Sequence, residues 1–408
     1  MLIMKVLEDK IFTDIKGYKA CGISAGLKKS GKKDFCIMFS EVPAVSAATF
    51  TTNKVKAAPV LLNMEHIKNS NTQAIVVNSG NANSCTGETG LKNACKMAEL
   101  TAASLNLVSQ EVLVGSTGVI GVPLPMDKIT YGIIESCKNL SYNGGFDAAA
   151  AIMTTDTFQK TIMVETEING KKILIGGIAK GSGMIHPNMG TMFSFLFSDV
   201  KISKKMLQKA LSDSVDLSYN MVSVDGDTST NDMVIALANG LADNDDIVEE
   251  GQAFDSFKEA LHLANTTLSK YIAKDGEGAT KLLEVNLTGA KTEKDAKLCA
   301  KSIITSSLVK SAFFGSDANW GRIMCALGYS DGEFDPDKVD VTFNNEIGEL
   351  QLVKNGCAAD FDEALAKEIL DQDTINIYID LNDGEYSATA WGCDLTYDYV
   401  KINGMYRT

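Results

Sequence analysis

Thr191 is the residue whose type and setting offer the clearest chemistry in this sequence. It follows Gly190 at the start of a predicted strand in which every second residue from Phe193 to Phe197 is phenylalanine. A hydroxyl there can attack the preceding carbonyl, because Gly190 has no Cβ to block the approach or to resist a strained backbone. Cleavage would give Thr191 a free α-amino group with a pKa of about 8, which can accept the proton of its own hydroxyl. The alternative is a glycine-rich turn that exposes a threonine.

A second loop, VLVGSTGVIG, follows a predicted strand over 112–114. In it, the Thr117 hydroxyl and the unhindered N–H of a glycine, Gly115, Gly118 or Gly121, can converge on a developing oxyanion, and one such donor is typically worth about 3 to 4 kcal/mol of barrier. The glycine spacing loosely resembles a dinucleotide-binding loop, but Pro123 and Pro125 are expected to prevent the helix that must follow one. The alternative is a purely structural loop.

Two other segments carry carboxylates. The run over 225–232, DGDTSTND, is dense in oxygen ligands. It lacks the glycine and the glutamate that a calcium-binding EF-hand loop requires, so it is interpreted as a polar turn or an active-site wall. Glu277 lies between two glycines and can present its carboxylate to a cationic substrate. Taken by itself, it is a loop glutamate that follows a helix end.

Other familiar patterns are excluded or interpreted as ordinary. Residues 22–26 match the G-x-S-x-G pattern of serine hydrolases, but LKKSGKK follows where a nucleophile elbow needs an apolar helix. His186 is interpreted as a loop histidine, and His66 and His262 as solvated. With three histidines and no Cys-x-x-Cys pair, no metal site is predicted.

Hydrophobic periodicity indicates a mixed α and β chain. Apolar residues at three- and four-residue steps predict helices over 91–105 and 254–272. Strands are predicted over 74–77, 112–114, 173–175, 233–238 and 283–287. Alternation over 375–381, the turn Asn382-Asp383-Gly384 and a strand over 386–391 predict a hairpin. With a helix over 359–370, this hairpin predicts a smaller C-terminal α/β unit from about residue 283.

Composition limits the functional classes. The chain has 408 residues, which suggests two domains or one large domain with an appendage. A net charge of −14 repels phosphate backbones and anionic lipid, so neither nucleic acid nor a membrane surface is an expected partner. Nine cysteines, an odd number, favour reduced thiols in the cytoplasm. The apolar start of the chain is too short for a signal peptide, and no apolar run is long enough for a membrane span.

Seven strings spread along the chain carry a more specific signal. In order and across essentially the whole sequence, they resemble the glutamate N-acetyltransferase family of arginine biosynthesis, also called ornithine acetyltransferase. The strings are VNSGNANSCTGETG, VGSTGVIG, AIMTTDTF, AKGSGMIHPNMGTM, VDGDTSTND, KDGEGATK and KINGMYRT.

The resemblance implies a proenzyme that cuts itself between Gly190 and Thr191, into chains 1–190 and 191–408 that assemble as a heterotetramer of two α and two β chains. It implies an α+β fold, a four-layer α/β/β/α sandwich similar to that of N-terminal-nucleophile hydrolases but differently connected. The main domain would span 1–282. A smaller α/β domain would span 283–408 and return its last residues to the active site. The family usually has alanine where this chain has Gly190, which puts the rate of cleavage in question.

The resemblance also implies the chemistry. N-acetylornithine would donate its acetyl group to Thr191, ornithine would leave, and glutamate would take the acetyl group, with Thr117 and Gly118 as the oxyanion hole. No cofactor is implied, and whether acetyl-CoA is a second donor stays open. The implied substrate contacts are Thr154, Lys180, Thr191, Glu277, Asn403 and Thr408. Lys180 suits the α-carboxylate that both substrates share, and Glu277 suits an amine.

Two rival functions remain at this point. The first is an aminopeptidase or amidase on the same scaffold, in which water takes the acyl group. The set of amino-acid anchors speaks against it, because a peptidase does not need so many. The second is a non-catalytic α/β binding protein, which would leave the chain uncut.

Overall fold

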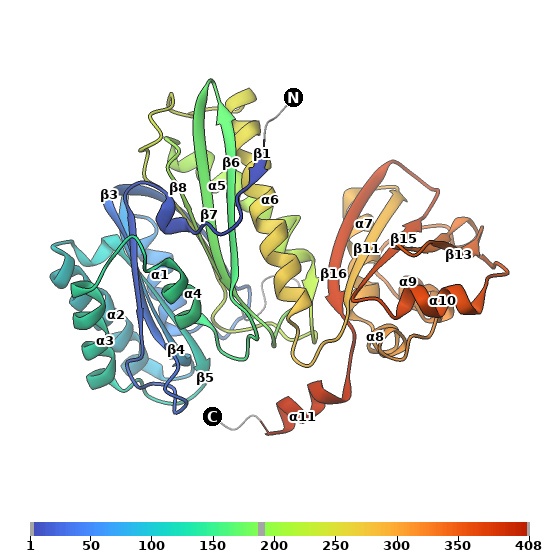
Figure 1. Ribbon diagram of the computed structural model, residues 1–408, viewed down its shortest axis with the longest axis horizontal. Coiled ribbons are helices and arrows are strands. Elements are labelled where there is room, and N and C mark those ends of the chain that lie inside the picture. Colours follow the sequence, from blue (N-terminus) through green and yellow to red (C-terminus); the bar gives the residue numbers. More distant parts are fainter. Residues whose placement is uncertain (1–3, 187–191, 406–408) are drawn as a thin grey trace.

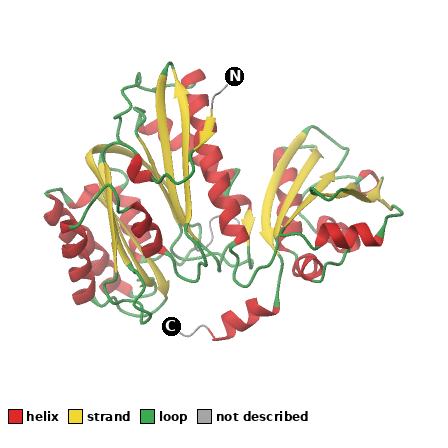
Figure 2. Cartoon of the chain, viewed as in Figure 1, coloured by secondary structure: helices red, strands yellow, loops and turns green. Residues whose placement is uncertain are grey.

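The computed structural model describes residues 4–186 and 192–405, and one long strand, β3 (Phe35–Phe50), organises its larger sheet (Figures 1 and 2). The first half of β3 pairs with β2 (Tyr18–Ile23) and β4 (Thr72–Asn81), and its second half pairs with β10 (Met233–Ala238). The strand order is β1-β6-β7-β8-β10-β3-β4-β5. The remaining strands are β1 (Met4–Val6), β5 (Val112–Val119), β6 (Lys160–Ile168), β7 (Lys171–Lys180) and β8 (Phe193–Ser198).

Apolar packing arranges this sheet and its helices in four layers. Helices α2 (Gly87–Leu105) and α3 (Met126–Lys138) pack on the outer face of the β3-β4-β5 part. Helices α5 (Lys204–Asp216) and α6 (Gln252–Lys274) pack on the outer face of the β6-β7-β8 part. The phenylalanines of β8 face inward, toward Ile75 and Leu113 of the other half. The predicted α/β/β/α sandwich is confirmed, and its two inner layers belong to one hydrogen-bonded sheet.

Two short helices complete this part. They are α1 (Ala58–His66) and α4 (Gly145–Ile152). His66, predicted to be solvated, is buried at the end of α1, and its Nδ1 lies 2.8 Å from the Val112 carbonyl oxygen. His262 is half-buried on α6 beside Ser214 and Thr266, so the prediction of a solvated side chain is wrong there too. In both cases the partners come from other parts of the chain or from an adjacent turn, where sequence patterns give no signal.

The predicted helix break after Pro125 is also wrong, because α3 begins at the next residue, Met126. A proline is tolerated at a helix start, where its missing N–H has no intrahelical partner to lose. The predicted helices over 91–105 and 254–272 are confirmed as α2 and α6.

The second sheet has the order β14-β13-β12-β15-β11-β16-β9. Its strands are β9 (Val222–Ser223), β11 (Leu282–Ala290), β12 (Asp340–Asn344), β13 (Glu349–Lys354), β14 (Cys357–Ala358), β15 (Thr374–Asp380) and β16 (Tyr386–Cys393). Its helices are α7 (Glu293–Thr305), α8 (Ser307–Phe314), α9 (Trp320–Gly328) and α10 (Glu363–Leu370). Strand β9 precedes residue 282, so residues from both sides of the predicted boundary form this sheet, and the domain limits stay a prediction.

The predicted hairpin between β15 and β16 is wrong. Strand β11 lies between them, parallel to β15 and antiparallel to β16. After β15, the N–H groups of Leu381 and Asp383 donate to carbonyls of Thr288 and Gly289 at the end of β11. The buried residues of β11 gain a pairing partner on each side, and this outweighs the local preference of the turn for a hairpin.

A last helix, α11 (Tyr397–Met405), runs from the second sheet back toward the first part (Figure 1). Among the helices of the described ranges, none combines the length and the apolar character needed to cross a bilayer.

Candidate active site

One pocket of about 120 Å³ brings together every predicted site residue that the structure describes. Strands β5 and β7, two loops and helix α11 supply these residues. They are Thr117, Gly118, Thr154, Lys180, Glu277 and Asn403. Gly190, Thr191 and Thr408 lie outside the described residues. Ser229 and Asn231 also line the pocket, so the 225–232 run forms part of its wall.

The Thr117 side of the pocket is held by side chains that bind its backbone. The amide nitrogen of Asn231 donates to the carbonyl oxygens of Ser116 and Ala82, at 2.7 Å in each case. Gly118 has φ of +129°, and a Cβ at this position would collide with the backbone of Gly80. The close approach of β4 and β5 therefore requires a glycine beside Thr117.

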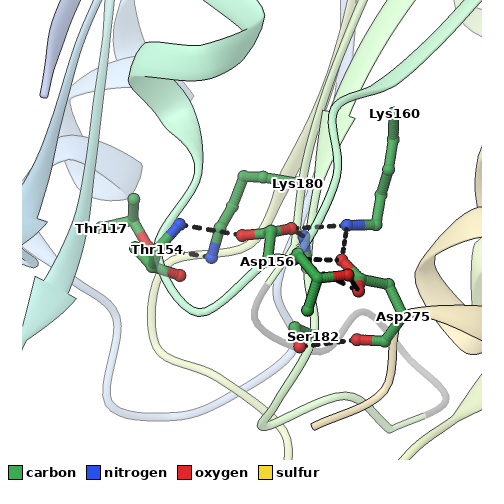
Figure 3. Close-up of polar contacts among 9 residues, drawn as sticks. Thr117, Thr154, Asp156, Lys160, Lys180, Ser182 and Asp275 are labelled. Atoms are coloured by element: carbon green, nitrogen blue, oxygen red, sulfur yellow. Dashed lines mark hydrogen bonds and ion pairs between the residues drawn. The ribbon is translucent and has the colours of Figure 1, made fainter. Parts of the chain in front are cut away.

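Lys180, the last residue of β7, is buried with its Nζ 3.3 Å from Thr117 Oγ1, to which it donates (Figure 3). Burial lowers the pKa of Lys180, and the negative charge of Asp156 opposes this effect most strongly. Its ammonium group is the cation of the pocket lining among the described residues. A carboxylate that entered the pocket could form a charge-assisted hydrogen bond with this ammonium group.

Outside the pocket lining, Lys160 lies between two carboxylates (Figure 3). Its Nζ donates to Asp156 Oδ1 at 2.7 Å and to Asp275 Oδ2 at 2.5 Å, and the three side chains are buried. The positive charges of Lys160 and Lys180, with hydrogen bonds, overcome the effect of burial and lower the pKa of Asp156 to about 2. Sequence patterns missed this cluster, although Asp156 and Asp275 both fall within strings that carry the family resemblance.

Glu277 follows the end of α6, and its N–H donates to the Ser182 carbonyl at 2.9 Å. Asn403 Nδ2, on α11, donates to Glu277 Oε2 at 2.8 Å. The carboxylate packs against Gly183, where any Cβ would overlap it. The far C-terminal helix therefore contributes to the pocket through a direct contact with Glu277.

Asp232, the last residue of the 225–232 run, is a buried carboxyl. Its Oδ1 accepts the N–H of Met192 at 2.9 Å, so it holds the backbone directly after Thr191. Its Oδ2 has no hydrogen-bond partner among the residues that the structure describes. Burial raises the pKa of Asp232 to about 8, against the opposing effects of the Met192 N–H, Lys180 and the Thr51 hydroxyl.

Within residues 4–186 and 192–405, no three or more His, Cys, Asp or Glu side chains are grouped so that they could hold a metal ion. The polar lining suits a small molecule that carries both a carboxylate and an amine.

Comparison with known proteins identifies the family. The model of the ArgJ family matches residues 19–408. The chain belongs to the ArgJ family. It is 56% identical over 405 residues to the arginine biosynthesis bifunctional protein ArgJ 1 of Clostridium acetobutylicum, covering 99% of both chains. It is 55% identical to the ArgJ protein of Caldanaerobacter subterraneus subsp. tengcongensis, covering 99% of this chain and 100% of that one.

Solved structures of similar proteins match part of the chain. A crystal structure of ArgJ from Bacillus halodurans is 44% identical, with a TM-score of 0.44, and matches 46% of this chain and 98% of that one. The ornithine acetyltransferase of Mycobacterium tuberculosis, solved with ornithine, is 38% identical, with a TM-score of 0.43, over 45% of this chain and 98% of that one.

Proposed function

We propose that this ArgJ family acyltransferase of arginine biosynthesis moves an acetyl group from N-acetylornithine to glutamate through an acetyl ester on Thr191. The observation that carries the proposal is the single pocket that Thr117, Gly118, Lys180, Glu277 and Asn403 share. A cation and a carboxylate at one small pocket complement the carboxylate and amine of an amino acid.

The proposed reaction has two halves. Thr191 Oγ attacks the acetyl carbonyl, the amide C–N bond breaks, and the amine of ornithine leaves with the proton that the hydroxyl gave up. The amine of glutamate then attacks the ester carbonyl, and its proton returns to Thr191. Thr117 and Gly118 stabilise the oxyanion in both halves, while Lys180 holds the substrate carboxylate.

We propose that cleavage between Gly190 and Thr191 leaves the two chains together. Strand β7 lies before the junction and β8 after it, and the two pair antiparallel from Ile175 opposite Ser198 to Lys180 opposite Phe193. This pairing and the shared apolar layers hold the fragments without a covalent link. The family resemblance also supports their further assembly into a heterotetramer. Light scattering of the purified protein tests this assembly.

The proposed location is the cytoplasm. All nine cysteines are free in the structure, and thiols stay reduced in that compartment. No cofactor is proposed. Acetyl-CoA is proposed as a second acetyl donor, since the curated relatives are named bifunctional proteins.

The test is a product measurement. Purified protein is given N-acetylornithine with and without saturating glutamate, and N-acetylglutamate and free acetate are quantified; a parallel assay offers acetyl-CoA. Mainly N-acetylglutamate supports the transferase, whereas mainly acetate supports the amidase alternative. N-terminal sequencing of a cut fragment should read Thr191-Met192-Phe193, and an active enzyme that stays one intact chain contradicts the proposed nucleophile.

Two variants assign the roles. Thr191→Ala should abolish cleavage and transfer together, because it removes the attacking hydroxyl. Thr117→Ala should lower turnover by about 10² to 10³, the loss expected for one oxyanion donor. Turnover within a few-fold of the parent would show that Thr117 is not in the oxyanion hole.

A further inference from the structure

The cluster of Lys160, Asp156 and Asp275 does not line the pocket, yet it binds backbone N–H groups of segments that contribute residues to the pocket. Asp156 Oδ2 accepts the N–H of Thr154 at 2.8 Å, and its Oδ1 accepts the N–H of Gly181 at 2.7 Å. One buried carboxylate thus fixes a pocket residue, Thr154, and the residue that follows Lys180.

Asp275 extends the same cluster toward Glu277. Its carboxylate accepts the N–H and the hydroxyl of Thr157, and its carbonyl oxygen accepts the Ser182 hydroxyl at 2.6 Å. Ser182 in turn accepts the N–H of Glu277 through its carbonyl oxygen. The cluster therefore ties the end of β7, the loop after α6 and the loop before β6 to one buried cation (Figure 3).

Charge gives Asp156 a second effect on the pocket. Lys180 is buried, and an ammonium group in such a place needs a nearby anion to stay protonated. The charged groups that act on Lys180 come from several elements: Asp156, Lys160, Asp232 and Glu277, with Lys28 contributing a further positive charge. Of the anions, Asp156 has the largest effect on Lys180.

We propose that Asp156, anchored by Lys160 and Asp275, is a positioning residue that keeps Lys180 charged and aimed, and so determines the selectivity of the pocket for substrates with a free α-carboxylate. This inference rests on the proposed function, because it takes Lys180 to be the carboxylate contact. Asp156 acts through Lys180 and Thr154 and does not itself line the pocket.

The deciding variant is Asp156→Asn, which keeps the shape of the side chain and removes its charge. An asparagine has one acceptor oxygen, so it cannot serve the N–H groups of Thr154 and Gly181 and the Lys160 ammonium together. The measurement is kcat/KM for N-acetylornithine divided by kcat/KM for its α-carboxamide. The ratio should fall about tenfold, with KM changing more than kcat, and the alkaline limb of kcat/KM should move to lower pH.

The direction of the pH shift follows from charge. Asp156 stabilises the protonated form of Lys180, so its loss lowers the pKa of Lys180, and carboxylate binding is lost at a lower pH. A merely structural change would lower kcat/KM for N-acetylornithine and for its α-carboxamide by the same factor. It would also leave the alkaline limb of the pH profile in place. Asp383→Asn is the matched control, since Asp383 also pairs with two lysines, Lys291 and Lys338, but on the far sheet. It should leave both the ratio and the limb unchanged.

Two further measurements keep the proposal testable. In Lys180→Met the ratio should fall as well, and adding Asp156→Asn should lower it little further, because both changes remove one interaction. If Asp156→Asn does not fold, Asp275→Asn decides instead: a smaller fall in the ratio supports the proposal, and an unchanged ratio overturns it. An unchanged ratio and limb in folded Asp156→Asn also overturns it.

A failure of the proposed function can be distinguished from a failure of the role proposed for Asp156. Calorimetric affinities of parent and variant for ornithine and ornithinamide report carboxylate selectivity without any acetyl transfer. A parent that binds ornithine but transfers no acetyl group contradicts the function, while the affinity ratio still tests the role of Asp156.

Discussion

Two buried aspartates near the pocket differ in charge, although they have the same side chain and similar burial. Asp156, below Lys180, has its pKa lowered to about 2, whereas Asp232, beside Met192, has its pKa raised to about 8. Asp156 accepts hydrogen bonds from an ammonium group and two backbone N–H groups. Among the described residues, the side chain of Asp232 accepts the backbone N–H of Met192, and the Thr51 hydroxyl contributes a smaller effect. Burial alone therefore does not decide whether a carboxyl is ionised; its cations and donors decide it.

The protonation state of each aspartate suits its position. At neutral pH the ionised Asp156 supports two lysines. The neutral form of Asp232 holds the backbone after the proposed nucleophile without adding a negative charge near an oxyanion. Four experiments test this difference between the two aspartates.

The largest effect is expected from removal of the shared cation. Lys160→Met leaves Asp156 and Asp275 buried without their common partner. Loss of one member of a buried ion cluster typically costs about 3 to 5 kcal/mol of unfolding free energy. Denaturant unfolding measures this loss. A variant as stable as the parent would mean that the cluster adds no net stability and would remove the basis of the contrast.

The second effect is a pH dependence of stability that Asp232 causes. Its folded pKa of about 8 lies above the unfolded value, so from pH 5 to 7 the folded state keeps a proton that the unfolded state has lost. Stability therefore falls as the pH rises, by about 3 kcal/mol over these two units. Asp232→Asn should lack this fall. Denaturant unfolding of both proteins at pH 5 and pH 7 measures the change in unfolding free energy between the two pH values. An equal change in parent and variant would contradict a neutral Asp232.

Asp156 should show the opposite sign. Its folded pKa of about 2 lies below the unfolded value, so its stabilising effect is complete above about pH 4 and is lost as the pH falls through 2. Parent protein should lose about 2 kcal/mol over this interval that Asp156→Asn does not lose. Acid unfolding followed by circular dichroism would measure it; equal acid sensitivity in the two proteins would argue against an ionised, paired Asp156.

The smallest effect is expected on the surface. Lys338 also pairs with two aspartates, Asp335 and Asp383, but its side chain is 45% exposed. Water screens such pairs, so Lys338→Met should leave the unfolding midpoint unchanged within error. This variant is the matched control for Lys160→Met, and a comparable loss in both would show that burial is not what separates them.

Local patterns were enough for many elements of the fold. The apolar stripes of α2 and α6 and the alternating phenylalanines of β8 are properties of neighbouring residues, and the structure has each of them as predicted. The motif strings also contain the residues that meet in the pocket, because they fold into strand ends, loops and helix α11 beside it. The self-cleavage site remains a prediction, since Gly190 and Thr191 lie outside the described residues.

Tertiary structure decided what depends on partners that are distant in the chain. The Asn382-Asp383-Gly384 turn predicted a hairpin, but β11 lies between β15 and β16 and pairs with both. Lys160 meets Asp275 115 residues later. Before the chain folds, Asp156 and Asp232 are the same chemical group. Folding surrounds Asp156 with cations and donors that keep it negatively charged, whereas the described residues around Asp232 do not outweigh its burial, so Asp232 stays uncharged at neutral pH.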